Sequence, residues 1–182
     1  MRVIAGRLGG RRLHAPRGRA TRPTAERVRE ALFSMLGPLD AEIVLDLFAG
    51  TGALAIEALS RGAARAVLVE RDRHALDALR RNLRELRLGQ AEVEVRHEEA
   101  RRALRKARER GEKYDLVFID PPYGQTGELE RELAEALPPL LAPGARVVVE
   151  GDARRDELSA LPLEVQARRR YGDTSVTILR QP

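Results

Sequence analysis

The chain has 182 residues, a length typical of one folded domain. Hydrophobic residues make up 43% and charged residues 34%, and no apolar run approaches the ~18 residues that a membrane-spanning helix needs. It has no cysteine and only three scattered histidines, which excludes disulfides and thiolate metal sites and makes a histidine metal cluster improbable. The first residues lack the continuous apolar stretch of a secretion signal. We therefore expect a cytoplasmic protein, without a metal ion or a membrane partner, and we favour a monomer.

The net charge of +5 is concentrated at one end of the chain. Residues 1–30 hold nine arginines against two glutamates, a net charge of +7, which leaves −2 for all remaining residues. A basic segment on a near-neutral body is typical of proteins that bind a polyanion, and nucleic acid is the commonest such partner. The alternative is a solvated basic tail.

The first elements in chain order are short. Residues 2–13 alternate weakly between apolar and polar around a Gly-Gly pair, which is consistent with a small hairpin. A loop rich in proline, glycine and arginine follows, and Thr24 stands where it could cap a helix over 25–36. This first part is expected to be a basic hairpin and helix.

Gly37 and Pro38 form the next break in the pattern. They divide the chain into a basic extension, residues 1–37, and a larger domain, residues 38–182.

In the larger domain, short β-branched runs alternate with charged amphipathic stretches, the pattern of parallel strands joined by crossover helices. The expected strands cover residues 43–48, 66–70, 92–96, 115–119 and 146–150, and the expected helices 53–61, 72–87, 99–110 and 127–141. Two further runs, 163–171 and 175–180, flank Gly172-Asp173 and predict an antiparallel hairpin. The sequence therefore predicts an α/β fold with a doubly wound, seven-stranded mixed sheet.

A glycine-rich loop follows the first of these strands, at residues 46–52. Glycines at a strand-to-helix turn let the backbone pass close to a ligand and expose N–H groups at the helix start. Glu70, twenty positions after Gly50, closes the second strand, as an acceptor for ribose hydroxyls should. Asp46 is an ionisable residue in an apolar strand and needs a partner there, such as a ligand ammonium or backbone N–H groups. Taken alone, the loop also fits a dinucleotide-binding fold or a tight turn without a ligand.

The second motif is Asp120-Pro121-Pro122-Tyr123, at the end of the fourth expected strand. Ligands of open α/β sheets bind beyond the carboxyl ends of the strands, so this turn and the glycine loop should face one crevice. Its prolines cannot donate, so the turn offers mainly acceptors, the Asp120 carboxylate and the Pro121 carbonyl. This pair suits an exocyclic amino group, and Tyr123 could stack on the ring that carries it. The alternative is a proline-stiffened strand exit.

Together, the two motifs resemble those of S-adenosylmethionine-dependent methyltransferases that modify exocyclic amines of nucleic-acid bases. The amino-terminal sequence Arg2-Val3-Ile4-Ala5-Gly6, then 22–24 (RPT) and 27–33 (RVREALF), is similar to the bacterial 16S ribosomal RNA guanine-N2 methyltransferase family. The resemblance covers nearly the whole chain, including Tyr171-Gly172. It implies the Rossmann-like class I methyltransferase fold.

The resemblance also implies the cofactor, S-adenosylmethionine, and its contacts. Asp46 and the glycine loop would hold the methionine moiety, Glu70 the ribose hydroxyls, and Glu99 or its neighbours the adenine amine. Where the family usually has an aspartate after the third strand, this chain has His97-Glu98-Glu99-Ala100. The cofactor-binding candidates are Asp46, Phe48, Ala49, Gly50, Thr51, Gly52, Glu70, Arg71, Glu99, Ala100 and Asp120.

For catalysis, the resemblance implies that Asp120 and the Pro121 carbonyl accept hydrogen bonds from the guanine N2 amine while Tyr123 stacks on the base. The catalytic candidates are Asp120, Pro121, Pro122 and Tyr123. The expected partner is 16S ribosomal RNA, in an assembling small subunit, and the RNA-binding candidates are Arg2, Arg7, Arg11, Arg12, Arg22 and Arg27. Residues 168–170, a run of three arginines, would extend this footprint or merely decorate an exposed strand.

Two other functions remain compatible with the motifs. Asp-Pro-Pro-Tyr also serves N6-adenine and N4-cytosine methyltransferases that act on DNA or another RNA, but a DNA enzyme that reads a sequence usually needs a longer chain. The other function is a basic RNA-binding module that has the fold without catalysis.

Overall fold

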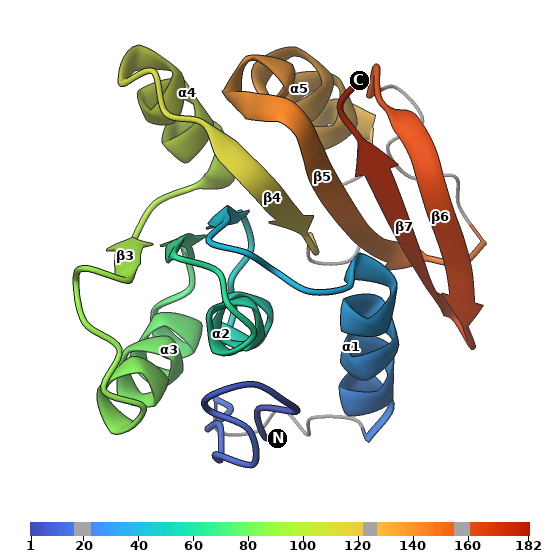
Figure 1. The fold of residues 1–182 in the computed structure, drawn as a ribbon. Helices are drawn as coiled ribbons and strands as arrows, with labels where there is room; N and C mark the ends of the chain where they lie inside the picture. The colour runs from blue at the N-terminus through green and yellow to red at the C-terminus, as the bar shows by residue number, and fades with distance from the viewer. Residues whose placement is uncertain (17–22, 122–126, 155–160) are drawn as a thin grey trace.

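The computed structural model describes residues 1–16, 23–121, 127–154 and 161–182. Seven strands form one sheet in the order β3-β2-β1-β4-β5-β7-β6 (Figure 1). The strands are β1 (Ile43–Asp46), β2 (Arg65–Val69), β3 (Val93–Arg96), β4 (Tyr114–Ile119), β5 (Leu141–Asp152), β6 (Glu164–Tyr171) and β7 (Thr174–Arg180). The first five are parallel, and β7 runs antiparallel to both β5 and β6. The predicted seven-stranded mixed sheet is confirmed.

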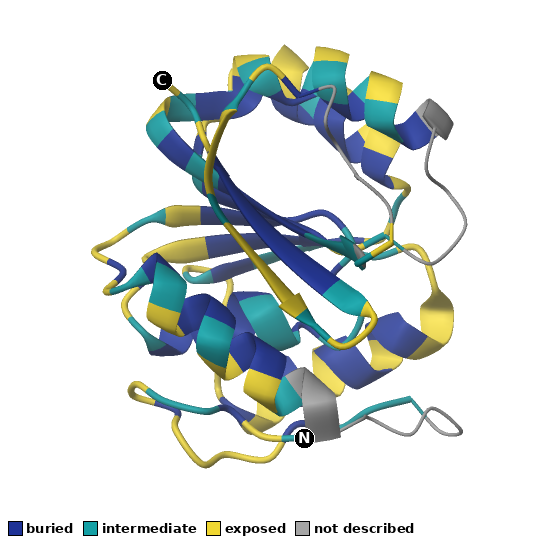
Figure 2. Cartoon of the chain, turned by 90° about the vertical axis from the view of Figure 1, so that its right-hand side faces the viewer, coloured by how far each residue is buried: buried dark blue, intermediate teal, exposed yellow. Residues whose placement is uncertain are grey.

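Helices cover both faces of the sheet, as Figure 1 shows. They are α1 (Pro23–Leu36), α2 (Ala53–Ser60), α3 (Arg73–Glu85), α4 (Ala100–Glu109) and α5 (Gly127–Ala136), with a short 3₁₀ helix, η1 (Pro138–Leu140). Alternate strand residues enter two apolar clusters, Val44 and Phe118 on the α1–α3 face, Leu45 and Val117 on the α4–α5 face. Figure 2 shows buried positions in dark blue along the central strands and on the helices of both layers.

Two local predictions were wrong. The helix expected over 127–141 ends at Ala136, because Pro138 and Pro139 lack the N–H groups that would continue it, and β5 begins directly after η1. Thr24 does not precede the first helix. The helix begins at Pro23, since proline has no N–H to lose at that position and its φ suits the first turn.

The amino-terminal segment forms the expected small hairpin. Its backbone N–H groups at Val3 and Gly10 bond to the carbonyls of Arg11 and Val3, both at 2.9 Å, and Arg2 bridges Arg12 in antiparallel fashion. Three of its side chains, those of Val3, Leu8 and Leu13, are buried in the apolar cluster on the α1–α3 face. This segment therefore shares its core with the larger domain.

At the other edge of the sheet, β6 and β7 pair from Tyr171 opposite Thr174. Gly172 makes the turn with a φ of +63°, a conformation that glycine adopts without strain. The predicted antiparallel hairpin is confirmed. Arg168, Arg169 and Arg170 are all exposed on the edge strand. Within the described ranges, no helix has the length and apolar character required to cross a membrane.

Candidate active site

The loop between β1 and α2 is fixed by its two neighbouring strands. Leu47 donates its N–H to the carbonyl of Phe118 on β4 at 3.1 Å, and Ala49 donates to Val69 on β2 at 2.9 Å. Phe48, half-buried, and Thr51 complete the turn. The loop is thus held at the carboxyl edge of the sheet, where both neighbouring strands also end.

The two glycines of the loop differ in the space around their Cα atoms. Both have positive φ, +54° at Gly50 and +80° at Gly52. A Cβ on Gly52 would lie 2.4 Å from Leu79 Cδ1, so this glycine allows α2 and α3 to pack closely. Among the residues that the structure describes, a Cβ on Gly50 would meet nothing nearer than the Phe48 carbonyl oxygen, at 4.0 Å. The loop therefore has an open side at Gly50, where a ligand could approach the backbone.

Asp46, the last residue of β1, is 2% exposed. Burial raises the pKa of its carboxyl to about 7, although hydrogen bonds from the backbone of Phe48 and Ala55 act in the opposite direction. The nearby Glu70 carboxylate contributes to the same rise. A buried acid in this state is suited to ionising beside a cationic ligand group.

Glu70 lies directly after β2 and reaches the glycine loop. Its Oε2 accepts a hydrogen bond from the Gly50 N–H at 2.7 Å, and its Oε1 accepts one from the Asp72 N–H at 2.7 Å. The structure therefore brings Asp46, Gly50 and Glu70 together, as the sequence reasoning required.

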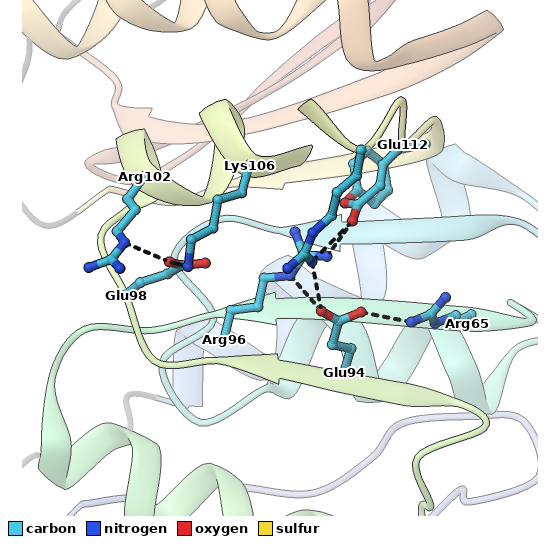
Figure 3. A network of polar contacts seen from close by, with 9 residues as sticks. Arg65, Glu94, Arg96, Glu98, Arg102, Lys106 and Glu112 are labelled. Carbon is cyan, nitrogen blue, oxygen red and sulfur yellow. Dashed lines mark hydrogen bonds and ion pairs between the residues drawn. The ribbon is translucent and has the colours of Figure 1, made fainter. Parts of the chain in front are cut away.

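The two candidate acids after β3 have different surroundings. Glu98, with its side chain 8% exposed, is paired with Lys106 at 2.6 Å and with Arg102 at 3.4 Å (Figure 3). Glu99 is 65% exposed and lies 3.6 Å from Arg71 across the end of β2. Ion pairs with two residues of α4 therefore hold Glu98, whereas Glu99 is the more exposed of the two acids.

Other residues of this turn support the arrangement. Ala100 is the buried first residue of α4. The Nε2 atom of His97 lies 3.1 Å from the Arg71 carbonyl oxygen and so links the turns after β2 and β3. Arg96 pairs at 2.7 Å with Glu94 on the same strand and at 2.7 Å with Glu112, which follows α4, so β3 is joined to the turn between α4 and β4 (Figure 3).

The proposed acceptor turn begins after β4, beside the glycine loop. Asp46 on β1 lies opposite Phe118 on β4, so the exposed Asp120 follows two residues later at the same edge of the sheet. Pro121 is half-buried, while Pro122 and Tyr123 lie outside the described residues.

Glu150 is a further acidic residue at this edge of the sheet that the sequence analysis did not single out. The last β4–β5 pair joins Ile119 to Val149, so Glu150 on β5 and Asp120, the first residue after β4, both come directly after that pair. Its side chain follows Val148 on the α1–α3 face, and burial raises its pKa. The signal was present, because Glu150 ends an apolar run just as Glu70 does.

The RNA-binding candidates are exposed at the described positions 2, 7, 11, 12 and 27, and Arg22 lies outside the described residues. Arg2 lies 3.6 Å from Glu26, Arg7 pairs with Glu92, and Arg11 donates to the Glu85 carbonyl at 3.2 Å. Three of these arginines therefore already contact glutamate residues elsewhere in the chain.

No group of three or more potential metal ligands gathers in the part of the chain that the structure describes.

Comparison with known proteins places this arrangement in a class. Over the whole chain, the fold superimposes on the Escherichia coli structure "Putative methyltransferase yhhF", with a TM-score of 0.82, 33% identity and coverage of 100% of this chain and 97% of that one. A hypothetical protein of Thermus thermophilus gives a TM-score of 0.80 at 32% identity, with 98% of each chain covered. The fold is that of the class I methyltransferases.

The family follows from the sequence comparison. Residues 1–180 match the family model "Conserved hypothetical protein 95", and the chain belongs to that family. Its relatives include ribosomal RNA small subunit methyltransferase D of Escherichia coli K12, 42% identical over 135 residues, which are 73% of this chain and 65% of that protein. The enzyme of the same name from Haemophilus influenzae is 36% identical over 68% of this chain and 64% of its own length. The resemblance to small-subunit rRNA methyltransferases is confirmed, and the aligned segments span about two thirds of these relatives.

Proposed function

We propose that this protein transfers a methyl group from S-adenosylmethionine to the exocyclic N2 amine of a guanine in small-subunit ribosomal RNA. The observation that carries the proposal is the gathering of Asp46, the Gly50 loop and Glu70 at the edge of the sheet where Asp120 begins the acceptor turn. The small-subunit methyltransferases in the same family support the substrate.

The residues present fit the cofactor. The open side of Gly50 leaves room beside the loop backbone, and the buried Asp46 carboxyl would ionise next to the cofactor's ammonium group. Glu70 would accept the ribose hydroxyls, and Glu99 would face the adenine amine. When bound, S-adenosylmethionine supplies a methyl group already activated on its sulfonium.

The acceptor base would be oriented by the turn after β4. Asp120 and the Pro121 carbonyl would accept hydrogen bonds from the two N2 hydrogens of guanine, which directs the nitrogen lone pair toward the methyl group. Tyr123 would stack on the base. A base in this position has to be unpaired or flipped out of its helix. Transfer would leave S-adenosylhomocysteine as the second product, and the proton that the N2 nitrogen loses would pass to the Asp120 carboxylate, so that no nucleophilic side chain is needed.

RNA would be held by the amino-terminal extension, residues 1–37, through Arg2, Arg7, Arg11, Arg12, Arg22 and Arg27. Arg12 and Arg27 are exposed and, within the described ranges, make no ion pair, which supports their assignment as phosphate contacts. The edge-strand arginines, residues 168–170, are a second candidate for the same surface.

The test uses unmodified 16S rRNA, both free and assembled with small-subunit proteins. Each is incubated with the purified protein and methyl-labelled S-adenosylmethionine, and the digested nucleosides are analysed by mass spectrometry. We expect N2-methylguanosine, with more product from the assembled particle. Methyladenosine or methylcytidine would instead favour the other exocyclic-amine chemistry. No product, with cofactor and RNA both bound, would indicate a non-catalytic RNA-binding module.

A further inference from the structure

Residues 1–14 are fastened to the two helices that follow the candidate cofactor turns. On α2, the fully buried carboxylate of Glu57 accepts hydrogen bonds from the N–H groups of Ile4 and Ala5, at 2.7 and 3.0 Å. Also on α2, the Ser60 hydroxyl oxygen accepts a hydrogen bond from Leu8 at 2.9 Å. The basic segment therefore rests on the framework of the cofactor site.

On α3, the side chain of Asn82 links the segment to the glycine loop itself. Asn82 is completely buried. Its Oδ1 accepts a hydrogen bond from the His14 N–H at 2.7 Å. Its Nδ2 group uses both hydrogens, donating to the His14 carbonyl at 3.1 Å and to the Thr51 carbonyl at 3.0 Å. The Asn82 amide therefore connects helix α3, the amino-terminal segment and the glycine loop.

The chemistry of this link is specific to an amide. One end has to accept a hydrogen bond and the other has to donate two, which neither aspartate nor a hydrophobic residue can do. The partner in the loop, Thr51, lies between Gly50 and Gly52, both in the left-handed region. The carbonyl held by Asn82 thus belongs to the same turn as Gly50, where the loop has its open side.

We propose that Asn82 is a positioning residue that couples the amino-terminal segment to the cofactor loop, so that RNA bound by the segment and cofactor bound by the loop strengthen each other's binding. The RNA half rests on the proposed function, whereas the effect on the cofactor loop does not. Thermodynamic linkage requires the coupling to be reciprocal: RNA should tighten cofactor binding by the same factor by which cofactor tightens RNA binding.

His14 provides a matched control. Its ring contacts Glu85 on α3, with Nε2 and Oε2 2.7 Å apart, while only its backbone contacts Asn82. His14→Ala therefore removes a contact between the same segment and the same helix but keeps the link to the loop. Asn82→Ala removes the link, and Asn82→Asp retains an acceptor for the His14 N–H but cannot donate to Thr51.

The experiment measures the dissociation constant of S-adenosylhomocysteine by calorimetry, without RNA and with saturating 16S rRNA. For the unaltered protein and for His14→Ala we expect the RNA to lower this constant about fivefold or more, within the usual range of allosteric coupling. For Asn82→Ala and Asn82→Asp we expect a constant raised about five- to tenfold without RNA, and a coupling ratio near one. Loss of stability alone would not change the ratio.

Each result has a defined meaning. Asn82→Asp preserves the side-chain volume. If the melting curve shows that Asn82→Ala does not fold, the same measurements are made on Asn82→Asp alone. An unchanged constant without RNA in the Asn82 variants would refute the positioning role, whether or not RNA binds. A ratio of one in the unaltered protein, with RNA bound, would refute the coupling alone. Absence of RNA binding would refute both the coupling and the RNA part of the proposed function.

Discussion

Glu70 and Gly50 are joined directly, although they follow different strands: the Glu70 carboxylate accepts the Gly50 N–H at 2.7 Å. The same carboxylate accepts the Asp72 N–H, so one side chain organises both turns. A ribose that binds Glu70 would meet a carboxylate already oriented by backbone N–H groups.

Glu70→Ala should weaken binding of S-adenosylhomocysteine by about 1–2 kcal/mol, the size of lost hydrogen bonds to a charged group. Calorimetry measures this change. Glu98→Gln is the control. Because Glu98 is paired with Lys106, this substitution should change the stability of the fold but not the affinity for the cofactor. The protein should bind neither NAD nor NADP, and tight NADH binding without binding of S-adenosylmethionine would contradict the cofactor assignment.

The two glycines of the loop should respond differently to alanine. Gly52→Ala should lower the free energy of unfolding by about 1–3 kcal/mol, since its methyl group would overlap Leu79 and strain the backbone. Gly50→Ala should have a smaller effect on stability but should weaken cofactor binding about tenfold or more, a loss of ~1.4 kcal/mol or more, because its methyl group fills the open side of the loop. Urea denaturation and calorimetry on both variants test this contrast, and the reverse pattern would contradict it.

Asp46 should make stability depend on pH. Its folded pKa of about 7 lies above the ordinary value of 3.8, so the folded protein holds a proton that the unfolded chain releases. Between about pH 4 and pH 7 this group therefore makes the fold less stable as the pH rises. Asp46→Asn should raise the free energy of unfolding at pH 8 by about 1–3 kcal/mol.

The same residue should link cofactor binding to a proton. If Asp46 ionises beside the cofactor's ammonium group, affinity should fall below about pH 7, and binding at pH 6 should release a proton. Calorimetry in buffers of different ionisation enthalpy detects that proton. A flat affinity from pH 6 to pH 8 would show that Asp46 does not meet the ammonium.

Asp120→Ala should reduce methyl transfer by about a hundredfold or more, a cost of ~2.7 kcal/mol or more in the barrier, and leave cofactor affinity within about twofold. The carboxylate is assigned to the acceptor amine, and the neighbouring prolines remain. Asp120→Asn keeps one acceptor oxygen and should retain part of the activity. Near-normal turnover by the alanine variant would mean that the turn is only structural.

RNA affinity should depend on salt through the basic segment. If about four arginines contact phosphates, a plot of log affinity against log salt should have a slope near −3, at about 0.7 per contact for single strands. Replacing Arg7, Arg11 and Arg12 by alanine should flatten the slope and leave cofactor binding nearly unchanged. Filter binding across a salt series measures the slope. An unchanged slope would mean that these three arginines do not contact phosphates, and would favour Arg168, Arg169 and Arg170 as the RNA contacts.

Local patterns were enough to predict the five parallel strands, because each is a short β-branched run next to charged amphipathic stretches, whereas β6 and β7 are predicted from the turn at Gly172-Asp173. The same logic located Glu70, which closes a strand twenty residues after Gly50. The prolines at 138 and 139 could have corrected the length of the fifth helix, since proline cannot continue a helix.

Other features depend on contacts between distant residues. Asn82 lies in the charged sequence Arg-Arg-Asn-Leu-Arg-Glu and has the pattern of a surface residue. Its burial results from partners 68 and 31 positions away. Arg29 adds to the basic charge of the first thirty residues but is 4% exposed, with its Nε atom 3.7 Å from Glu57. Charge counted along the sequence therefore overstates what an RNA can reach.

The place of β7 in the sheet has a consequence for synthesis on the ribosome. Among the described strands it is made after the other six, yet it lies between β5 and β6, with Val176 and Ile178 buried. Until residues 174–180 emerge, a nascent chain leaves the long edge of β5 unpaired and β6 without a partner. Unpaired strand edges promote association between chains. The growing polypeptide is thus prone to associate with other chains until β7 pairs with β5 and β6.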